Sequence, residues 1–173
     1  MASIDNLNTL LVSELRDLYD AEQRLTKAIP KLVEKSTHGD LISALNKHLN
    51  ETRQHVARLE EAFDGIGEDA EAETCAGIKG IISEADDSVG DCEEGSVRDA
   101  AIIGGAQRAE HYEIAAYGTA IAHARLLGLD PVARLLEATL AEEKAANQAL
   151  TDIAQNVVNP DAQAGIEEVR PRA

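Results

Sequence analysis

The chain has 173 residues, enough for one domain with a substantial core, and 44% of them are hydrophobic although only 2% are aromatic. With 32 acidic against 16 basic residues the formal net charge is −16, which argues against DNA, RNA and anionic membranes as partners. Such acidity is typical of a solvated surface, and adaptation of that surface to high salt is an open alternative.

The sequence carries no signal for export or for membrane insertion. Its first residues show no basic region followed by an apolar run, and no stretch approaches the roughly 18 apolar residues that a membrane span needs. Cys75 and Cys92 match no metal-ligand spacing and are expected to stay reduced. We therefore expect a cytoplasmic protein without a membrane partner.

Apolar residues at helical intervals predict two long helices in the first part of the chain. One spans Asp5 to Thr37 and the other Asp40 to Asp64. Pro30 lies inside the first of these segments and predicts a kink there. Because only a few residues around Gly39 join the segments, we expect them to pack as an antiparallel hairpin.

The stretch from Glu68 to Ser96 is different, because it is rich in Asp, Glu and Gly. A short part of it, from Thr74 to Asp87, has three isoleucines at helical spacing. We interpret the stretch as a long crossover that carries one small helix.

Two further helical segments follow the crossover. One spans Ser96 to Leu127, and the next opens at Asp130-Pro131, where Asp130 caps the helix and the proline fits its first turn, and runs to Val158. Asn159-Pro160 is predicted to end it. Residues 1–160 would then form the domain, and residues 161–173 a flexible tail.

The order of these elements indicates the fold class. Two antiparallel helix hairpins joined by one long crossover have the topology of ferritin-like bundles. The sequence therefore predicts an all-α protein with a ferritin-like four-helix bundle, whose crossover carries a short extra helix.

Charged side chains interrupt the apolar stripe of every long segment. Glu22 lies between Leu18 and Leu25 at helical spacing, and the other segments carry acids or histidines on or beside the same stripe. These residues are Glu110 and Glu113 in the third segment, Glu143 in the fourth, and His48 and His55 in the second, where the uncharged Thr52 shares the stripe and Glu51 lies beside it.

An unpaired carboxylate in a core is costly, and too few basic residues share these stripes to pair all the acids. Two metal ions between the helices would neutralise several carboxylates at once. Carboxylate and imidazole ligands suit iron or manganese, so we predict a site for two iron ions, or two manganese ions.

The ligand pattern matches ferritin-like sites only in part. Such sites use Glu-x-x-His pairs, whereas Glu51 and His55 are four apart, and His48 is an alternative partner. Glu143 has no histidine after it. Asn147 stands there as a weak ligand, or else water or an additional carboxylate completes that metal's coordination.

The charged residues on these stripes also have structural explanations that involve no metal. Glu22 could pair with Arg58, Glu110 with Arg108, and Glu51 could be a surface acid beside two core histidines. Tyr117, one turn beyond Glu113, could be a core residue or could donate a hydrogen bond to a ligand from a second layer.

Four segments together resemble the YciF/YciE-like ferritin-like family, over roughly Ile4 to Val158. They are LRDLYDAEQRL at residues 15–25, HLNETRQHVARLE at 48–60, EHYEIAAY at 110–117 and LAEEKA at 140–145. The resemblance implies a rubrerythrin-like bundle, a homodimer and a link to stress responses. It also implies metal ligation by Glu22, Glu51, His55, Glu110, Glu113 and Glu143.

Two functions stay open at this point. The first is a di-metal protein that reacts with peroxide or oxygen, as a peroxidase or catalase does, with Tyr117 near the metals. The four-cysteine iron domain of rubrerythrin has no counterpart here, so no electron path is built into the chain. The second is a stress-associated scaffold or metal-binding protein without catalysis, whose site is empty or structural.

Overall fold

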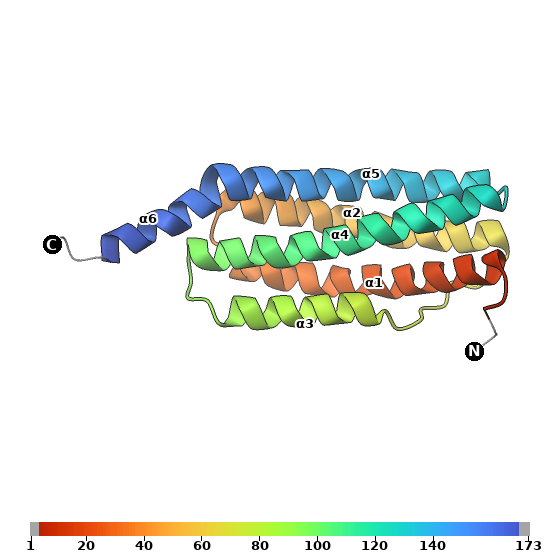
Figure 1. Cartoon of the computed structure of the whole chain (residues 1–173), viewed down its shortest axis with the longest axis horizontal. Coiled ribbons are helices and arrows are strands. Elements are labelled where there is room, and N and C mark those ends of the chain that lie inside the picture. Colours follow the sequence, from red (N-terminus) through yellow and green to blue (C-terminus); the bar gives the residue numbers. More distant parts are fainter. Residues whose placement is uncertain (1–3, 170–173) are drawn as a thin grey trace.

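The computed structural model describes residues 4–169, which form an elongated bundle of helices (Figure 1). No strand occurs within that range. In chain order the helices are α1 (Leu7–Lys35), α2 (Gly39–Ile66), α3 (Ala76–Gly90), α4 (Ser96–Leu126), α5 (Asp130–Ile153), the π-helical turn η1 (Ala154–Val158) and α6 (Asn159–Val169).

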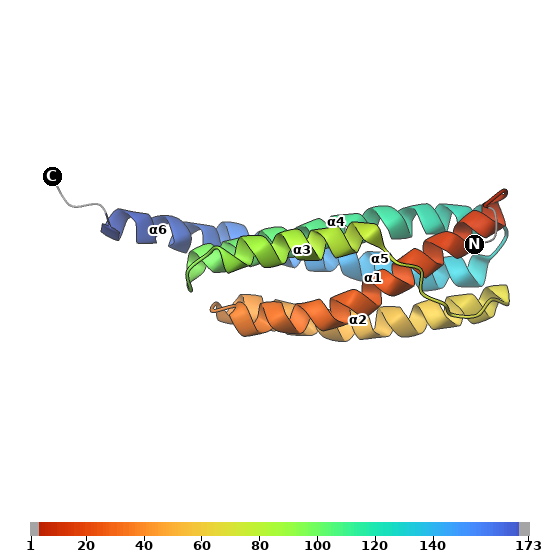
Figure 2. The ribbon, with the colours of Figure 1, turned by 90° about the horizontal axis from the view of Figure 1, so that it is seen from below.

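The four long helices form two antiparallel hairpins, α1 with α2 and α4 with α5 (Figures 1 and 2). The shorter α3 lies along the outside of this bundle, mainly against α4 and also against α1. The predicted fold, two hairpins joined by a long crossover with one extra helix, is confirmed.

Local interactions explain where the first hairpin begins and turns. Asn6 caps α1, since its side chain accepts a hydrogen bond from the Thr9 backbone N–H at 3.0 Å. At the turn into α2, the buried Asp99 of α4 accepts three hydrogen bonds from Thr37 and His38, at 2.6–3.0 Å. A buried carboxylate thereby fixes the connection of one hairpin to the other.

The structure differs from the sequence prediction at two prolines. α1 continues through Pro30 as one helix. The predicted end at Asn159-Pro160 is wrong, because α5 passes through a π-helical turn into α6. Pro160 is the second residue of α6 and directly follows this π-helical turn and Asn159. Residues 170–173 of the predicted tail lie outside the described residues.

The apolar core consists of two clusters, one toward each end of the bundle. Along α1, Leu18 belongs to one cluster and Leu25 to the other, and Glu22 lies between them. The same interruption occurs in α2 between Leu49 and Leu59, and in α5 between Leu136 and Leu150. A polar layer therefore crosses the middle of the core. Among the described residues, no helix has the length and apolarity that crossing a membrane requires.

We expect the contact between α3 and α4 to depend on a glycine. A Cβ atom placed on Gly105 would lie 2.7 Å from the Cβ of Ala85, so Gly105→Ala must push α3 away. This overpacking should lower the melting temperature by about 3 °C or more. In the same helix, Gly118→Ala meets nothing within 4 Å and should stabilise the protein by up to about 1 kcal/mol. Thermal unfolding followed by circular dichroism checks both, and equal effects would contradict the close packing.

Candidate metal centre

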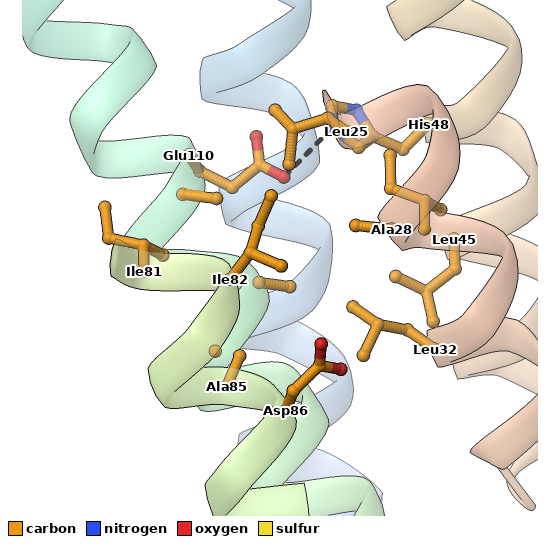
Figure 3. A pocket seen from close by; sticks show the side chains of 14 residues that line it. Leu25, Ala28, Leu32, Leu45, His48, Ile81, Ile82, Ala85, Asp86 and Glu110 are labelled. Carbon is orange, nitrogen blue, oxygen red and sulfur yellow. Dashed lines mark ion pairs between the residues drawn. The ribbon is translucent and has the colours of Figure 1, made fainter. Parts of the chain in front are cut away.

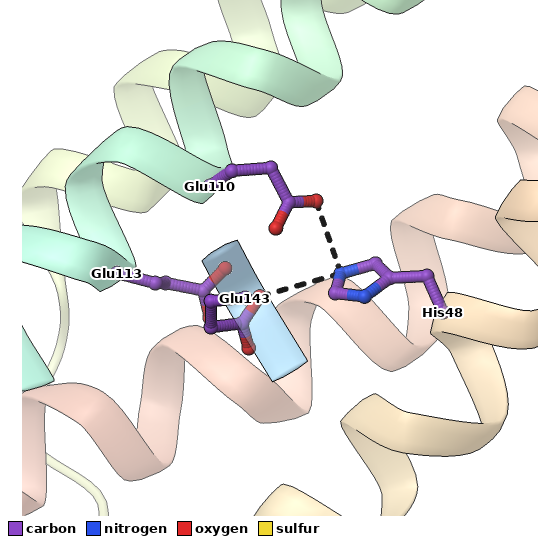
Figure 4. Close-up of side chains that lie close together, drawn as sticks. All are labelled: His48, Glu110, Glu113 and Glu143. Atoms are coloured by element: carbon purple, nitrogen blue, oxygen red, sulfur yellow. Dashed lines mark ion pairs between the residues drawn. The ribbon is translucent and has the colours of Figure 1, made fainter. Parts of the chain in front are cut away.

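The polar layer holds six carboxylate and imidazole side chains from all four long helices. They form two groups that could each hold a metal ion, with ligand atoms within 4.8 Å of one another. The first group is His48, Glu110, Glu113 and Glu143 (Figure 4), and the second is Glu22, His55 and Glu143. None of the six residues is more than 7% exposed.

Glu143 of α5 belongs to both groups and lies between the two histidines of α2. Its Oε1 is 2.9 Å from His55 Nδ1, and its Oε2 is 3.9 Å from His48 Nε2. A second carboxylate, from a further helix, lies beside each histidine. Glu110 Oε1 lies 3.2 Å from His48 Nε2, and Glu22 Oε1 lies 3.3 Å from His55 Nδ1. One carboxylate is thus placed to bridge two neighbouring sites.

The donors of this layer fit a pair of cations. Within the described residues, both oxygens of Glu113 and one oxygen each of Glu22 and Glu110 are buried without a hydrogen-bond partner. The oxygens of Glu143 form no well-aligned hydrogen bond either, although Oε1 lies 2.9 Å from His55 Nδ1. No Lys or Arg of the described chain forms a salt bridge with these carboxylates. An orphaned buried acceptor costs about 1–3 kcal/mol, so these oxygens need cations or protons. Carboxylate and imidazole donors together suit iron or manganese.

Burial raises the pKa of Glu110 and of Glu113 well above the usual range, and neighbouring carboxylates raise both further. Burial also raises the pKa of Glu22, although contact with His55 opposes that shift. Without metal, Glu110 and Glu113 therefore keep their protons at a pH at which exposed glutamates are ionised.

The two histidines have opposite electrostatic surroundings. Burial lowers the pKa of His48, which leaves the neutral imidazole that binds metals. Burial alone would lower the pKa of His55 too, but its contacts with Glu143 and Glu22 raise it to about 10. Burial alone would raise the pKa of Glu143, whereas its contacts with His55 and Glu110 lower it. Without metal, His55 is an imidazolium between two carboxylates.

Two residues outside the cluster, Glu142 and Arg58, hold the other ring nitrogen of His55 in place. His55 Nε2 lies 2.9 Å from Glu142 Oε2, and the Arg58 guanidinium binds both oxygens of Glu142. A carboxylate on the far nitrogen is the usual support of a metal-ligating histidine. The alternative in which Arg58 pairs with Glu22 is therefore wrong. The sequence did not single out Glu142, whose one signal was its place beside Glu143. The arginine that it pairs with comes from a different helix.

Tyr117 supplies a hydrogen bond to the cluster. Its hydroxyl donates to Glu22 Oε1 at 2.6 Å, and the side chain is fully buried. Burial and the charge of Glu22 raise the pKa of Tyr117 well above its usual range, so the phenol keeps its proton. The structure therefore places this tyrosine in direct contact with a candidate ligand.

Two predicted ligands lie outside both groups. Glu51 accepts a hydrogen bond from Lys47 on Oε1, and its Oε2 is 4.0 Å from His48 Nδ1. Asn147 accepts a hydrogen bond from Gln107 at 3.2 Å. Their ligation of metal stays a prediction. Arg108 pairs with Glu84 and not with Glu110, so that structural alternative is wrong.

The fold and the site define a ferritin-like helical bundle with a buried cluster of carboxylates and imidazoles. The chain belongs to the DUF892 family, described as a domain of unknown function, which matches residues 6–163. Its sequence is 37% identical to protein YciF of Escherichia coli over 162 residues, 93% of this chain and 98% of YciF. The resemblance to YciF-like proteins is thereby confirmed.

Solved structures show the same fold. The crystal structure of the E. coli stress protein YciF matches with a TM-score of 0.86 at 38% identity, covering 90% of this chain and 99% of that one. YcfI from Rhodopseudomonas palustris matches with a TM-score of 0.85 at 45% identity, covering 87% and 96%. A protein from Xanthomonas campestris at 18% identity has a TM-score of 0.72, covers 93% and 99%, and shares the fold.

We expect the metal-free protein to lose stability as the pH rises. A carboxyl whose pKa is raised on folding holds a proton that the unfolded chain releases near pH 4.5, so folding becomes costlier above that pH. His55 acts in the same direction, because its contribution is complete below pH 6.5 and is lost as the pH rises through about 10. The melting temperature in chelator should therefore fall from pH 5 to pH 8.5.

The variant Glu113→Gln tests the cause of this slope. It removes a group that must either hold a proton or bear a buried charge, while keeping the shape. At pH 8.5 in chelator it should therefore melt at least about 3 °C higher than the unmodified protein. The exposed Glu61→Gln serves as the matched control and should change little. If Glu113→Gln melted at the same temperature as the control at every pH, the buried Glu113 carboxyl would not be a cause of the pH dependence.

Proposed function

We propose that this protein binds two iron or two manganese ions between its helices and reacts with oxygen or peroxide. The observation that carries the proposal is the position of Glu143, whose two oxygens face the two histidine-containing groups. The orphaned oxygens around it supply further negative ligands. Few purely structural arrangements would leave so many buried acceptors unpaired.

The proposal assigns His48, Glu110 and Glu113 to one ion, Glu22 and His55 to the other, and Glu143 to both. Such a pair of ions would supply redox equivalents and Lewis acidity toward a bound O–O group. Each side chain has its own task. The hydroxyl oxygen of Tyr117 lies 2.6 Å from Glu22 Oε1 and donates its proton to that hydrogen bond. Glu142 with Arg58 fixes the ring of His55 so that Nδ1 faces the cluster.

The comparisons support a place in the stress response. The relative YciF is described as a stress protein, and it covers nearly the whole of this chain. A small oxidant as substrate agrees with that setting and with a buried site. The proposal takes the reductant that returns the metals to their starting state from outside the chain, because the described residues contain no further group of metal ligands beside these two.

A second candidate function has one specific observation in its favour. His55, with a pKa of about 10, already forms a cation between Glu22 and Glu143. Together with protonated Glu110 and Glu113, it offsets much of the buried charge without any metal. The protein would then be a stress-associated scaffold that keeps the polar layer as a structural element.

Metal analysis of natively purified protein by inductively coupled plasma mass spectrometry separates the two functions. The proposal expects about two iron or manganese ions per chain, about one in Glu22→Gln and in Glu113→Gln, and fewer than one in Glu143→Gln, because that residue serves both ions. Glu61→Gln should keep both ions. The absence of metal from the unmodified protein even after incubation with Fe²⁺ or Mn²⁺, with its melting temperature unchanged, would establish the scaffold instead.

A further inference from the structure

Two pockets among the described residues reach the same pair of side chains, His48 and Glu110, from different sides of the bundle. The first lies between α1, α2, α3 and α4, and the second between α2 and α5, where Glu110 of α4 also lines it. Because both end on candidate ligands, both can connect the buried layer with the surface. Their linings, however, differ in chemistry.

The first pocket, which we call the aliphatic pocket, has a volume of about 40 Å³. Its walls carry side chains such as Leu25, Ala28, Leu32 and Ile82, and Figure 3 shows them converging on an inner end formed by Glu110 and His48. Asp86 lies at the opposite end. Between these ends the lining is hydrocarbon.

Size and lining together select the molecule that suits the aliphatic pocket. An engineered cavity of about 150 Å³ binds benzene, so a pocket of about 40 Å³ suits a molecule of a few atoms better than an organic hydroperoxide as large as benzene. Water and hydrogen peroxide would lose hydrogen bonds along the hydrocarbon walls, which costs about 1–3 kcal/mol for each unmade bond. A diatomic apolar molecule loses none, and dioxygen is therefore the favoured occupant.

The second pocket, which we call the charged mouth, has a volume of about 30 Å³ and is bordered by the small side chains Ala44, Ala146 and Ala149. Lys47 and Glu51 line it and form an ion pair with each other. The ammonium of Lys47 is largely exposed, with 67% of the side chain accessible. A positive group thus already occupies the outer side of this opening.

Glu51 connects the charged mouth with the buried layer. One of its oxygens accepts from Lys47, and the other is buried, has no hydrogen-bond partner and lies 4.0 Å from His48 Nδ1. A divalent cation that displaced the ammonium would find this carboxylate, and then His48 and Glu110, as successive ligands. The formal net charge of −16 attracts cations to the surface, whereas the aliphatic pocket would strip a cation of its hydration without replacement.

We propose that the metal site has two separate entrances, an aliphatic one between α1 and α3 that admits dioxygen and a charged one between α2 and α5, closed by Lys47 and Glu51, that admits divalent cations. This inference rests on the proposed function and specifies the substrate of the metal site as dioxygen rather than peroxide. It also gives Glu51 a part in metal uptake without making it a resident ligand.

The rate of Co²⁺ uptake by the metal-free protein, followed by stopped-flow absorption, tests the charged mouth. Ala44→Phe fills that opening and should slow uptake by about tenfold or more, which corresponds to about 1.4 kcal/mol in the barrier. Ala28→Phe places the same extra volume in the aliphatic pocket and should leave the rate unchanged. Lys47→Met should speed uptake, because the ammonium no longer competes for Glu51.

Dioxygen itself is the probe for the aliphatic pocket. In methyl NMR spectra of the metal-free protein under oxygen pressure, the paramagnetic gas should broaden Ile82 and Leu32 more than the buried Leu136 at the other end of the bundle. Ala28→Phe should abolish this difference and Ala44→Phe should preserve it. If either phenylalanine variant fails to fold by circular dichroism, the leucine variants at both positions replace the pair.

The outcomes separate this inference from the proposed function. Failure of the unmodified protein to bind Co²⁺, Fe²⁺ or Mn²⁺ would overturn the proposed function and the charged mouth with it. Normal Co²⁺ binding with the same rate in Ala44→Phe and Ala28→Phe would overturn the two entrances and leave the metal site standing. Equal oxygen broadening at Ile82 and Leu136 would overturn the assignment of dioxygen to the aliphatic pocket.

Discussion

The neutralisation of four buried carboxylates is the constraint on which the rest of the structure depends. Glu22, Glu110, Glu113 and Glu143 lie in the middle of the bundle with at most 2% exposure. A protein of this size is stable by about 5–15 kcal/mol, and a few orphaned charges would consume that margin. The fold is therefore compatible with the layer only when protons, the imidazolium of His55 or metal ions balance the charge.

The same layer determines how the core is divided. It separates two apolar clusters, so each long helix needs leucines or small residues on both sides of its polar position. All candidate ligands of this layer lie on the four long helices, and none of them lies on a loop. Rigid helices also keep ligand positions fixed while protons and cations exchange, because each helix is anchored by apolar packing at both ends.

Helical periodicity was sufficient to predict the fold and most of the layer, because the acids of α1, α4 and α5 interrupt stripes that are otherwise apolar. In α2 it placed His48 and His55 on the stripe and Glu51 beside it. Spacing alone did not decide whether Glu51 or His48 acts together with His55, because residues three and four apart both share a helix face. The pairing of Arg58 with Glu142 depends on which helices are neighbours, and a single sequence does not contain that information. The π-helical turn after Ile153 had no sequence signal, so the continuation into α6 was missed.

The crossover helix α3 is outside the four-helix arrangement that holds the ligands, yet it shapes the surroundings of the site. Ile81, Ile82 and Ala85 of α3 close the aliphatic pocket against α1 and α4. Ala85 packs directly on Gly105, where any side chain would displace α3. Both residues line the aliphatic pocket, so the close approach of Ala85 to Gly105 helps to shape it. A segment that only connects two hairpins in the topology thus forms one wall of the aliphatic pocket, which ends at Glu110 and His48.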